Sequence, residues 1–461
     1  MRGHIAQAAL ERALERTAKA DRKVRSLLKQ HRDDSAGLMV LATGGYARGD
    51  LAPYSDLDLI IVSTDLDRHE PVVREFVQAL WDTPYTPAPT VVAFDELDAS
   101  FFTVPDRASS MFESRFIWGD RDLADQFQNN VNRVVDAEVF EIFAERKQEE
   151  FTARRAKYGS VPRVLEPHLK SEAGGFRDLH HVFWLEQAGM ALRGKWKLRR
   201  NLSTMIERFA KRLSVIGQFM EWETNEFIEA FGFLLAVREM LHERYQRCED
   251  RLIVAEQPVI GRKLGFVGDD RQVMIDLMRA VFHASEKHSR FCDEFGHFFR
   301  HSRQYGRRIA PSPERSLQIP PGQDRFSLDI NLIRRYSSSP QMLVHFIEST
   351  IESGLLLSGH SRHVFRRILH REHNSHTEAD PALSTDWFSD SNSSDEDNPL
   401  YIIENWKEPL RNWFELPSDL ATRLRRMDEL DTIKLWLPEW HEIAGLTTGS
   451  YYHRYTVDEH T

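Results

Sequence analysis

The residues with the clearest chemical meaning are two aspartates, Asp56 and Asp58, at the start of an apolar run from Leu57 to Val62. The apolar run predicts a strand, and side chains two positions apart on a strand share a face, so the two carboxylates point the same way. Paired carboxylate oxygens suit Mg²⁺, which proteins commonly hold through one or two carboxylates together with substrate phosphates. The spacing therefore indicates a metal site at Asp56 and Asp58 that activates an attacking oxygen and stabilises a leaving one.

A double glycine, Gly44 and Gly45, precedes these aspartates and ends a short apolar run over 38–41. Residues without side chains leave room for a polyphosphate to approach backbone N–H groups. Arg48 follows, and a guanidinium binds phosphate oxygens through two parallel hydrogen bonds. The alternative is a turn followed by a solvated strand face. The mostly apolar strand favours a functional site, because an isolated buried carboxylate is costly.

A few regular elements must hold these residues in place. Apolar positions recur at helical spacing over 5–32, which predicts one long amphipathic helix. Residues 38–41, 57–62 and 90–94 are predicted strands, and 70–82 is a predicted helix. Together these elements predict a small α/β unit at the start of the chain.

From about residue 135 onwards the apolar pattern is almost entirely helical, so the predicted fold class is α+β. We expect three domains: an α/β domain over 1–130, a helical domain over 131–310 and a further helical region over 311–461. Four prolines between Arg308 and Arg325 predict an extended linker there. Residues 371–399 are too polar to bury and are predicted to be a disordered insert.

Composition narrows the class of protein. The 461 residues carry 61 Lys and Arg against 71 Asp and Glu, a formal charge of −10. This balance argues against a general nucleic-acid-binding protein, which carries a basic footprint. Two cysteines, Cys248 and Cys292, cannot form a disulfide framework and favour a reducing compartment. No apolar run approaches the length of a membrane span. We expect a soluble, cytoplasmic protein without nucleic-acid or membrane partners.

The run from Gly44 to Leu59 resembles the signature of the nucleotidyltransferase superfamily. More closely, it is similar to the N-terminal domain of the bifunctional PII uridylyltransferase/uridylyl-removing family. Further segments resemble motifs of that family along nearly the whole chain: Leu80–Asp82, Glu113–Asp120, Leu165–Leu179, Glu249–Leu252, Leu424–Met427 and Tyr455–Thr461. The resemblance implies a nucleotidyltransferase domain followed by helical domains.

The resemblance also implies a reaction. The family transfers UMP from UTP to a tyrosine of the nitrogen-regulatory protein PII and releases pyrophosphate, with Mg²⁺ required and glutamine as the usual effector. Carried over to this sequence, Asp56 and Asp58 are the catalytic metal ligands, and Gly44, Gly45 and Ser55 line the triphosphate. Lys170 and Arg177 are second contacts to phosphate or base. Ordinary structural pairing, for instance of Arg177 with neighbours of Asp178, explains Lys170 and Arg177 equally well.

Two features depart from the family pattern. The family's third strand reads Gly-His-Ser-x-Arg, whereas Ala88–Val92 here contains neither the His nor the Arg. A third carboxylate is not obvious either, since Asp95 is read more readily as the N-cap of a following helix. These departures leave two alternatives open: a catalytically weak regulatory or binding homologue, and a nucleotidyltransferase with another acceptor.

The family's uridylyl-removing activity belongs to an HD domain, a helical bundle that binds its metal through several His and Asp residues. Only the first His of that set, His460, is present before the sequence stops at Thr461. One histidine is not a metal site, because catalytic metals are bound by a set of ligands. The sequence therefore predicts a truncated HD domain and a chain that transfers UMP without removing it.

Overall fold

The computed structural model describes most of the chain, with gaps. The described residues are 2–159, 164–215, 221–305, 325–326, 330–352, 356–357, 361, 365, 369, 402–415, 419–430 and 432–440. The predicted linker over 308–325 therefore lies outside them apart from Arg325. The predicted disordered insert, 371–399, and His460 also lie outside the described residues.

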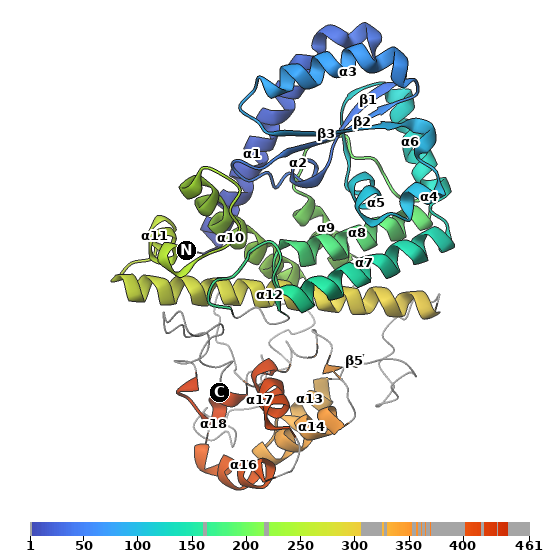
Figure 1. Cartoon of the computed structure of the whole chain (residues 1–461). Coiled ribbons are helices and arrows are strands. Elements are labelled where there is room, and N and C mark those ends of the chain that lie inside the picture. Colours follow the sequence, from blue (N-terminus) through green and yellow to red (C-terminus); the bar gives the residue numbers. More distant parts are fainter. Residues whose placement is uncertain are drawn as a thin grey trace. The chain divides into compact units, whose positions relative to one another are not determined.

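A four-stranded mixed sheet forms the centre of the N-terminal part (Figure 1). Its strands are β1 (Leu38–Ala42), β2 (Leu57–Ser63), β3 (Pro87–Ala93) and β4 (Arg115–Gly119), in the order β3-β2-β1-β4. Strand β1 is antiparallel to β2 and β4, while β2 and β3 run parallel. The three predicted strands are confirmed. Strand β4 was not predicted, because it is short and begins with a charged residue.

That charged residue, Arg115, is fully buried and explains how β4 joins the fold. Its guanidinium donates two hydrogen bonds to the Asp21 carboxylate, at 2.7 and 2.8 Å, and a third to the carbonyl oxygen of Tyr46. A buried cation needs such a partner, because desolvation is otherwise too costly. Asp21 lies on α1 (Arg2–Leu28), so the ion pair ties this helix to β4.

Helices α1 and α3 (Leu66–Trp81) supply apolar side chains to one face of the sheet. Val24 of α1 and Phe76 of α3 are fully buried in a cluster with Leu59 of β2. The helix predicted over 5–32 is confirmed as α1 and a 3₁₀ turn over Lys29–Asp34. The helix predicted over 70–82 is confirmed as α3 and begins four residues earlier, where Asp65 accepts a hydrogen bond from the Arg68 N–H.

Strand β3 is an edge strand with two prolines, Pro87 and Pro89. The Leu57 N–H donates to the Thr86 carbonyl at 2.8 Å. In a parallel ladder every second residue of a strand bonds to the same neighbour, so this bond shows which residues of β3 face β2. Residues 86, 88, 90 and 92 therefore direct their backbone groups to β2. The two prolines fall on the alternate positions, which face the free edge, where a missing N–H costs no ladder hydrogen bond.

The helices that follow confirm the predicted switch from strands to helices and, with the sheet, the α+β fold class. In Figure 1 some of these helices lie beside the sheet and the longest lie beneath it. They are α4 (Ala99–Phe102), α5 (Pro105–Phe112), α6 (Arg121–Val134), α7 (Ala137–Tyr158), α8 (Phe176–Leu192), α9 (Met205–Val215), α10 (Glu221–Tyr245), α11 (Gln257–Lys263) and α12 (Asp270–Tyr305).

Helix α1 packs along α10 and so joins the sheet to the helical part. A Cβ atom at Gly232 would lie 2.7 Å from the Ala6 carbonyl oxygen, so only glycine permits this approach. Two turns further along, Glu239 of α10 is fully buried and forms ion pairs with Arg12 and Arg16 of α1.

The chain divides into two compact units, one containing Met1–Gly296 and the other His297–Ala444. Described elements of the second unit are β5 (Arg325–Phe326), α13 (Ile330–Tyr336), α14 (Pro340–Glu352), β6 (Leu356–Leu357), α16 (Lys407–Phe414), α17 (Leu420–Glu429) and α18 (Ile433–Trp436). Its core gathers Phe346, Trp406 and Trp413, among others. None of the helices in the described ranges is long and apolar enough to cross a membrane.

Candidate active site

A cavity of about 730 Å³ lies in the first unit and is lined by both the sheet part and the helical part. All eight residues singled out by the sequence line it: Gly44, Gly45, Arg48, Ser55, Asp56, Asp58, Lys170 and Arg177. The first six come from the α2–β2 region, where α2 is Gly44–Arg48. The other two come from the turn before α8 and from the first turn of α8.

Asp58 of β2 points away from the apolar face and into this cavity. Leu57, Leu59 and Ile61, its alternate neighbours, belong to the core under α1 and α3. The carboxylate lies so close to Gly44 that a Cβ there would be 2.3 Å from Asp58 Oδ2, and Gly44 also has a φ of +60°. Both facts require glycine at 44. The glycine therefore makes room for the aspartate as well as for any ligand.

The environment of Asp58 favours a bound cation. The pKa of Asp58 is raised to about 6: burial raises it most, Arg48 partly offsets this, and the charges of Glu113 and Asp56 also raise it. Asp56 lies one residue before β2, not within it, and is exposed. Within the described residues no group of three or more His, Cys, Asp or Glu side chains could hold a metal. A pair of carboxylates open to a cavity fits Mg²⁺ that takes its remaining ligands from phosphate and water.

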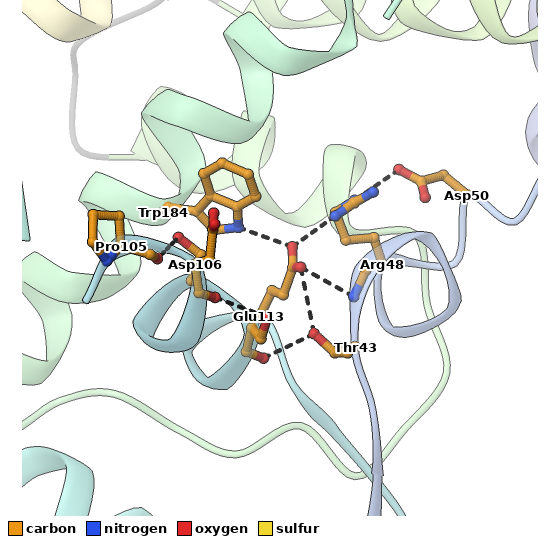
Figure 2. Close-up of polar contacts among 10 residues, drawn as sticks. Thr43, Arg48, Asp50, Pro105, Asp106, Glu113 and Trp184 are labelled. Atoms are coloured by element: carbon orange, nitrogen blue, oxygen red, sulfur yellow. Dashed lines mark hydrogen bonds and ion pairs between the residues drawn. The ribbon is translucent and has the colours of Figure 1, made fainter. Parts of the chain in front are cut away.

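A buried carboxylate that the sequence analysis did not identify as a site residue, Glu113, lies at the centre of the polar network in Figure 2. Its Oε2 accepts hydrogen bonds from Arg48 Nη1 at 2.6 Å and from Trp184 Nε1 at 2.9 Å. Its Oε1 accepts from the Gly44 N–H at 3.0 Å, with Thr43 Oγ1 3.5 Å away. Glu113 is the first residue of the segment Glu113–Asp120, which resembles a motif of the family. That resemblance was the sequence signal that could have identified Glu113 as a site residue.

These contacts correct two predictions about phosphate binding. Arg48 is buried and binds two carboxylates, Asp50 at 3.0 Å and Glu113 at 2.6 Å, so its guanidinium is not held free for a bidentate phosphate contact. Although burial lowers the pKa of Arg48, the two carboxylates raise it above its ordinary value. The backbone N–H of Gly44 is likewise already donated to Glu113. This arginine fixes the shape of the Gly44–Gly45 turn.

One face of α8 supplies the helical wall of the cavity. Arg177, His180 and Trp184 recur at spacings of three and four residues, which brings side chains to the same face of a helix. The Trp184 ring lies between two cations, with Lys147 Nζ 4.4 Å and Arg177 Cζ 5.6 Å from its centroid. The sequence signal for His180 and Trp184 was this periodicity, read together with Arg177.

Lys170 and Arg177 are half-buried cations, and neither has a hydrogen bond or ion pair to a carboxylate within the described residues. Asp178 pairs with Arg154 at 2.6 Å and with Arg155 at 2.7 Å, so these two arginines neutralise it. Ordinary structural pairing of Arg177 stays an alternative, because its guanidinium packs over the Trp184 ring. Burial lowers the pKa of Lys170, and the nearby charges of Arg238 and Arg177 lower it further. Together with Asp58 these two cations line the same cavity and give its helical wall a positive charge.

His180 adds an imidazole without a hydrogen-bond partner in the described residues to that wall. It is buried, and neither ring nitrogen has a hydrogen-bond partner in the described part of the chain. Burial lowers the pKa of His180 well below its ordinary value, and the charges of Arg48 and Arg177 contribute. The ring is therefore neutral near pH 7, with one N–H donor and one nitrogen acceptor for a ligand.

Strand β3 faces the cavity beside Asp58 without an acidic side chain. Asp58 pairs in register with Ala88, and Thr90 follows on the same face. Asp95 lies in a 3₁₀ turn (Phe94–Glu96) and does not line the cavity. The prediction that Asp95 caps the next helix is wrong, because Asp98 accepts the N–H of Phe101 at the start of α4.

Comparisons with known proteins give a consistent picture. The model "GlnD PII-uridylyltransferase" matches residues 142–295, and the model "Nucleotidyltransferase domain" matches 22–86. Proteins named bifunctional uridylyltransferase/uridylyl-removing enzyme are 26% identical over 452 residues in Neisseria gonorrhoeae and 26% identical over 441 residues in Azospirillum brasilense. These matches cover 97% and 92% of this chain but 48% and 42% of the relatives. The chain thus spans about half the length of the curated relatives it matches.

Proposed function

We propose, on the premise that this chain is a relative of the bifunctional uridylyltransferase/uridylyl-removing enzymes, that it transfers UMP from UTP to a tyrosine of a PII-type regulatory protein. The observation that supports this most strongly is the gathering of all eight candidate residues around one cavity. The proposal concerns the transfer and not the removal reaction that the relatives' name also contains.

In this proposal the residues on each wall of the cavity bind a different part of the substrate complex. Asp56 and Asp58 hold Mg²⁺, which when bound offsets the charge of the phosphates. Lys170 and Arg177 bind the triphosphate from the helical side, and Gly44, Gly45 and Ser55 line it from the other side. The tyrosine oxygen then attacks the α-phosphorus in line, the bond to the bridging oxygen breaks, and pyrophosphate leaves.

The direct experiment is to incubate the purified chain with Mg²⁺, a PII protein and labelled UTP, ATP, GTP or CTP, with and without glutamine. Mass spectrometry should find UMP on a PII tyrosine, and UTP should be the preferred donor. Asp58→Asn should abolish the product, whereas Asp95→Asn, outside the cavity, should not. Equal transfer by wild type and Asp58→Asn would contradict the proposal. Transfer to a different acceptor would retain the chemistry and change the partner.

The second candidate is a regulatory homologue that binds nucleotide with little turnover. It is favoured by β3, which presents Ala88 and Thr90 beside Asp58 instead of a further carboxylate. This candidate predicts that UTP with Mg²⁺ raises the melting temperature of the chain while no acceptor becomes labelled. Product formation at more than one turnover per chain would exclude it.

A further inference from the structure

The loop between α2 and β2, residues 50–56, carries Ser55 and Asp56 into the cavity and is here called the aspartate loop. Three of its carbonyl oxygens accept hydrogen bonds from side chains outside the sheet. Arg16 of α1 donates to Leu51 at 2.9 Å, and His242 of α10 donates to Pro53 at 2.6 Å. The thiol of Cys248, just beyond α10, donates to Tyr54 at 3.0 Å. The helical part therefore holds this loop by its backbone.

The aspartate loop needs such external support. Tyr54 has a φ of +58°, in the left-handed region that bulky residues rarely adopt, and its side chain is 53% exposed. Such a conformation costs about 1 to 3 kcal/mol and persists only where the surroundings fix it. Inside the loop, the described backbone hydrogen bond is from the Ser55 N–H to the Ala52 carbonyl, at 3.3 Å.

His242 is fully buried, and both of its ring nitrogens meet oxygen atoms that can only accept. Nδ1 faces the Pro53 carbonyl at 2.6 Å, and Nε2 faces Asp250 Oδ1 at 3.3 Å. The ring is thus fixed between the aspartate loop and a carboxylate. Neither His242 nor Asp250 lines the cavity, so neither touches a ligand there.

Asp250 is itself held in place and reaches the other wall of the cavity. Arg238 Nε donates to the same Oδ1 at 2.5 Å. Although burial raises the pKa of Asp250, the hydrogen bond from His242 and the charge of Arg238 lower it well below its ordinary range. The backbone carbonyl of Asp250 accepts the Leu169 N–H at 2.8 Å, next to Lys170. Asp250 therefore connects the aspartate loop, through His242, with the turn that carries Lys170.

We propose that His242, oriented by Asp250, is a positioning residue that fixes the aspartate loop and thereby the place of Asp56. The importance of that place rests on the proposed function, in which Asp56 binds Mg²⁺. Loss of the hydrogen bond from His242 to the Pro53 carbonyl should increase the equilibrium constant for local opening of the loop about ten-fold.

The test uses hydrogen exchange of the backbone amides over residues 50–57 in the ligand-free chain. His242→Leu, which removes both donors, should speed this exchange about ten-fold. His242→Asn, which keeps one donor near Pro53, and Asp250→Asn should have smaller effects. The matched control is His69→Leu, because His69 is also buried, contacts the Ala36 carbonyl at 3.1 Å and lies away from the cavity.

A second readout links the loop to metal binding. The Mg²⁺ concentration that gives half of the thermal stabilisation in the presence of UTP should rise about ten-fold in His242→Leu and stay unchanged in His69→Leu. Unchanged exchange at 50–57 in a folded His242→Leu variant would overturn the proposal, and so would equally fast exchange in His242→Leu and His242→Asn. Faster exchange with an unchanged Mg²⁺ midpoint would overturn it as well. Neither readout needs turnover, so a wild-type chain that fails to transfer UMP would contradict only the proposed function.

Discussion

At the scale of single residues, Asp58 shows how function and stability oppose each other. Its carboxylate is buried in a cavity beside other acids, and its pKa is raised from 3.8 to about 6. Between these values the folded chain binds more protons than the unfolded chain. The free energy of unfolding without metal therefore falls as the pH rises through this window and levels off above it.

The substitution Asp58→Asn should therefore stabilise the metal-free chain above pH 7 by roughly 1 to 3 kcal/mol. The same variant should lose the stabilisation that Mg²⁺ with UTP gives to the wild type. Urea unfolding at pH 4 and pH 7.5 measures both effects, and the gain should vanish at pH 4. A variant that is less stable than wild type at pH 7.5 would show that Asp58 is paired in a way the structure does not contain.

Lys170 is the second residue whose role can be separated from folding. It is a half-buried cation in the cavity wall without a carboxylate partner within the described ranges. Lys170→Met keeps the stem and removes the charge, so binding of UTP or pyrophosphate should weaken about ten-fold or more while the melting temperature changes little. Isothermal titration measures the affinity, and exposed Lys195→Met is the matched control. Unchanged affinity would remove Lys170 from the phosphate site.

Local spacing predicted that Gly44, Asp56 and Asp58 lie around one cavity, since they are close in sequence. The same reasoning misjudged Arg48, because its partner Glu113 is brought near only by the pairing of β4 with β1. His180 and Trp184 were missed for the same reason: their position in the cavity depends on how α8 packs. Helical spacing relates His180 and Trp184 to Arg177, but it does not show that this face of α8 packs against the sheet part.

At the scale of elements, the indole of Trp184 links α8 to the sheet part. Trp184 donates its Nε1–H to Glu113, the residue that ends α5 and precedes β4, at 2.9 Å. Lys147 of α7 packs against the same ring. The sequence predicted α8 as helical but gave no sign of this attachment, and it missed β4 because β4 begins with the buried Arg115.

Trp184→Phe should lower the free energy of unfolding by about 1 to 3 kcal/mol, because a buried carboxylate loses a donor while the ring remains. Trp81→Phe is the control, since Trp81 is 59% exposed at the end of α3. Chemical unfolding followed by circular dichroism compares the two. Equal stability of both variants would mean that Glu113 is satisfied by Arg48, Thr43 and Gly44 alone.

At the scale of the whole molecule, α1 and α10 join the sheet part to the helical part of the first unit. Glu239→Ala leaves Arg12 and Arg16 without their buried partner and should cost about 3 to 5 kcal/mol. Glu243→Ala, an exposed position one turn further along α10, should change stability by less than about 0.5 kcal/mol. Thermal unfolding distinguishes the two, and similar melting temperatures would show that apolar packing alone joins the helices.

The free edge of β3 has a consequence for the docking of a protein acceptor under the proposed function. An extended segment laid along this edge would find carbonyl acceptors at Pro87 and Pro89 but no N–H donor before Val91. Strand addition, in which a bound peptide extends a sheet through main-chain hydrogen bonds, is therefore disfavoured at the free edge of β3. Under the proposed function, we therefore expect a protein acceptor to bind through its side chains rather than as a fifth strand at this edge.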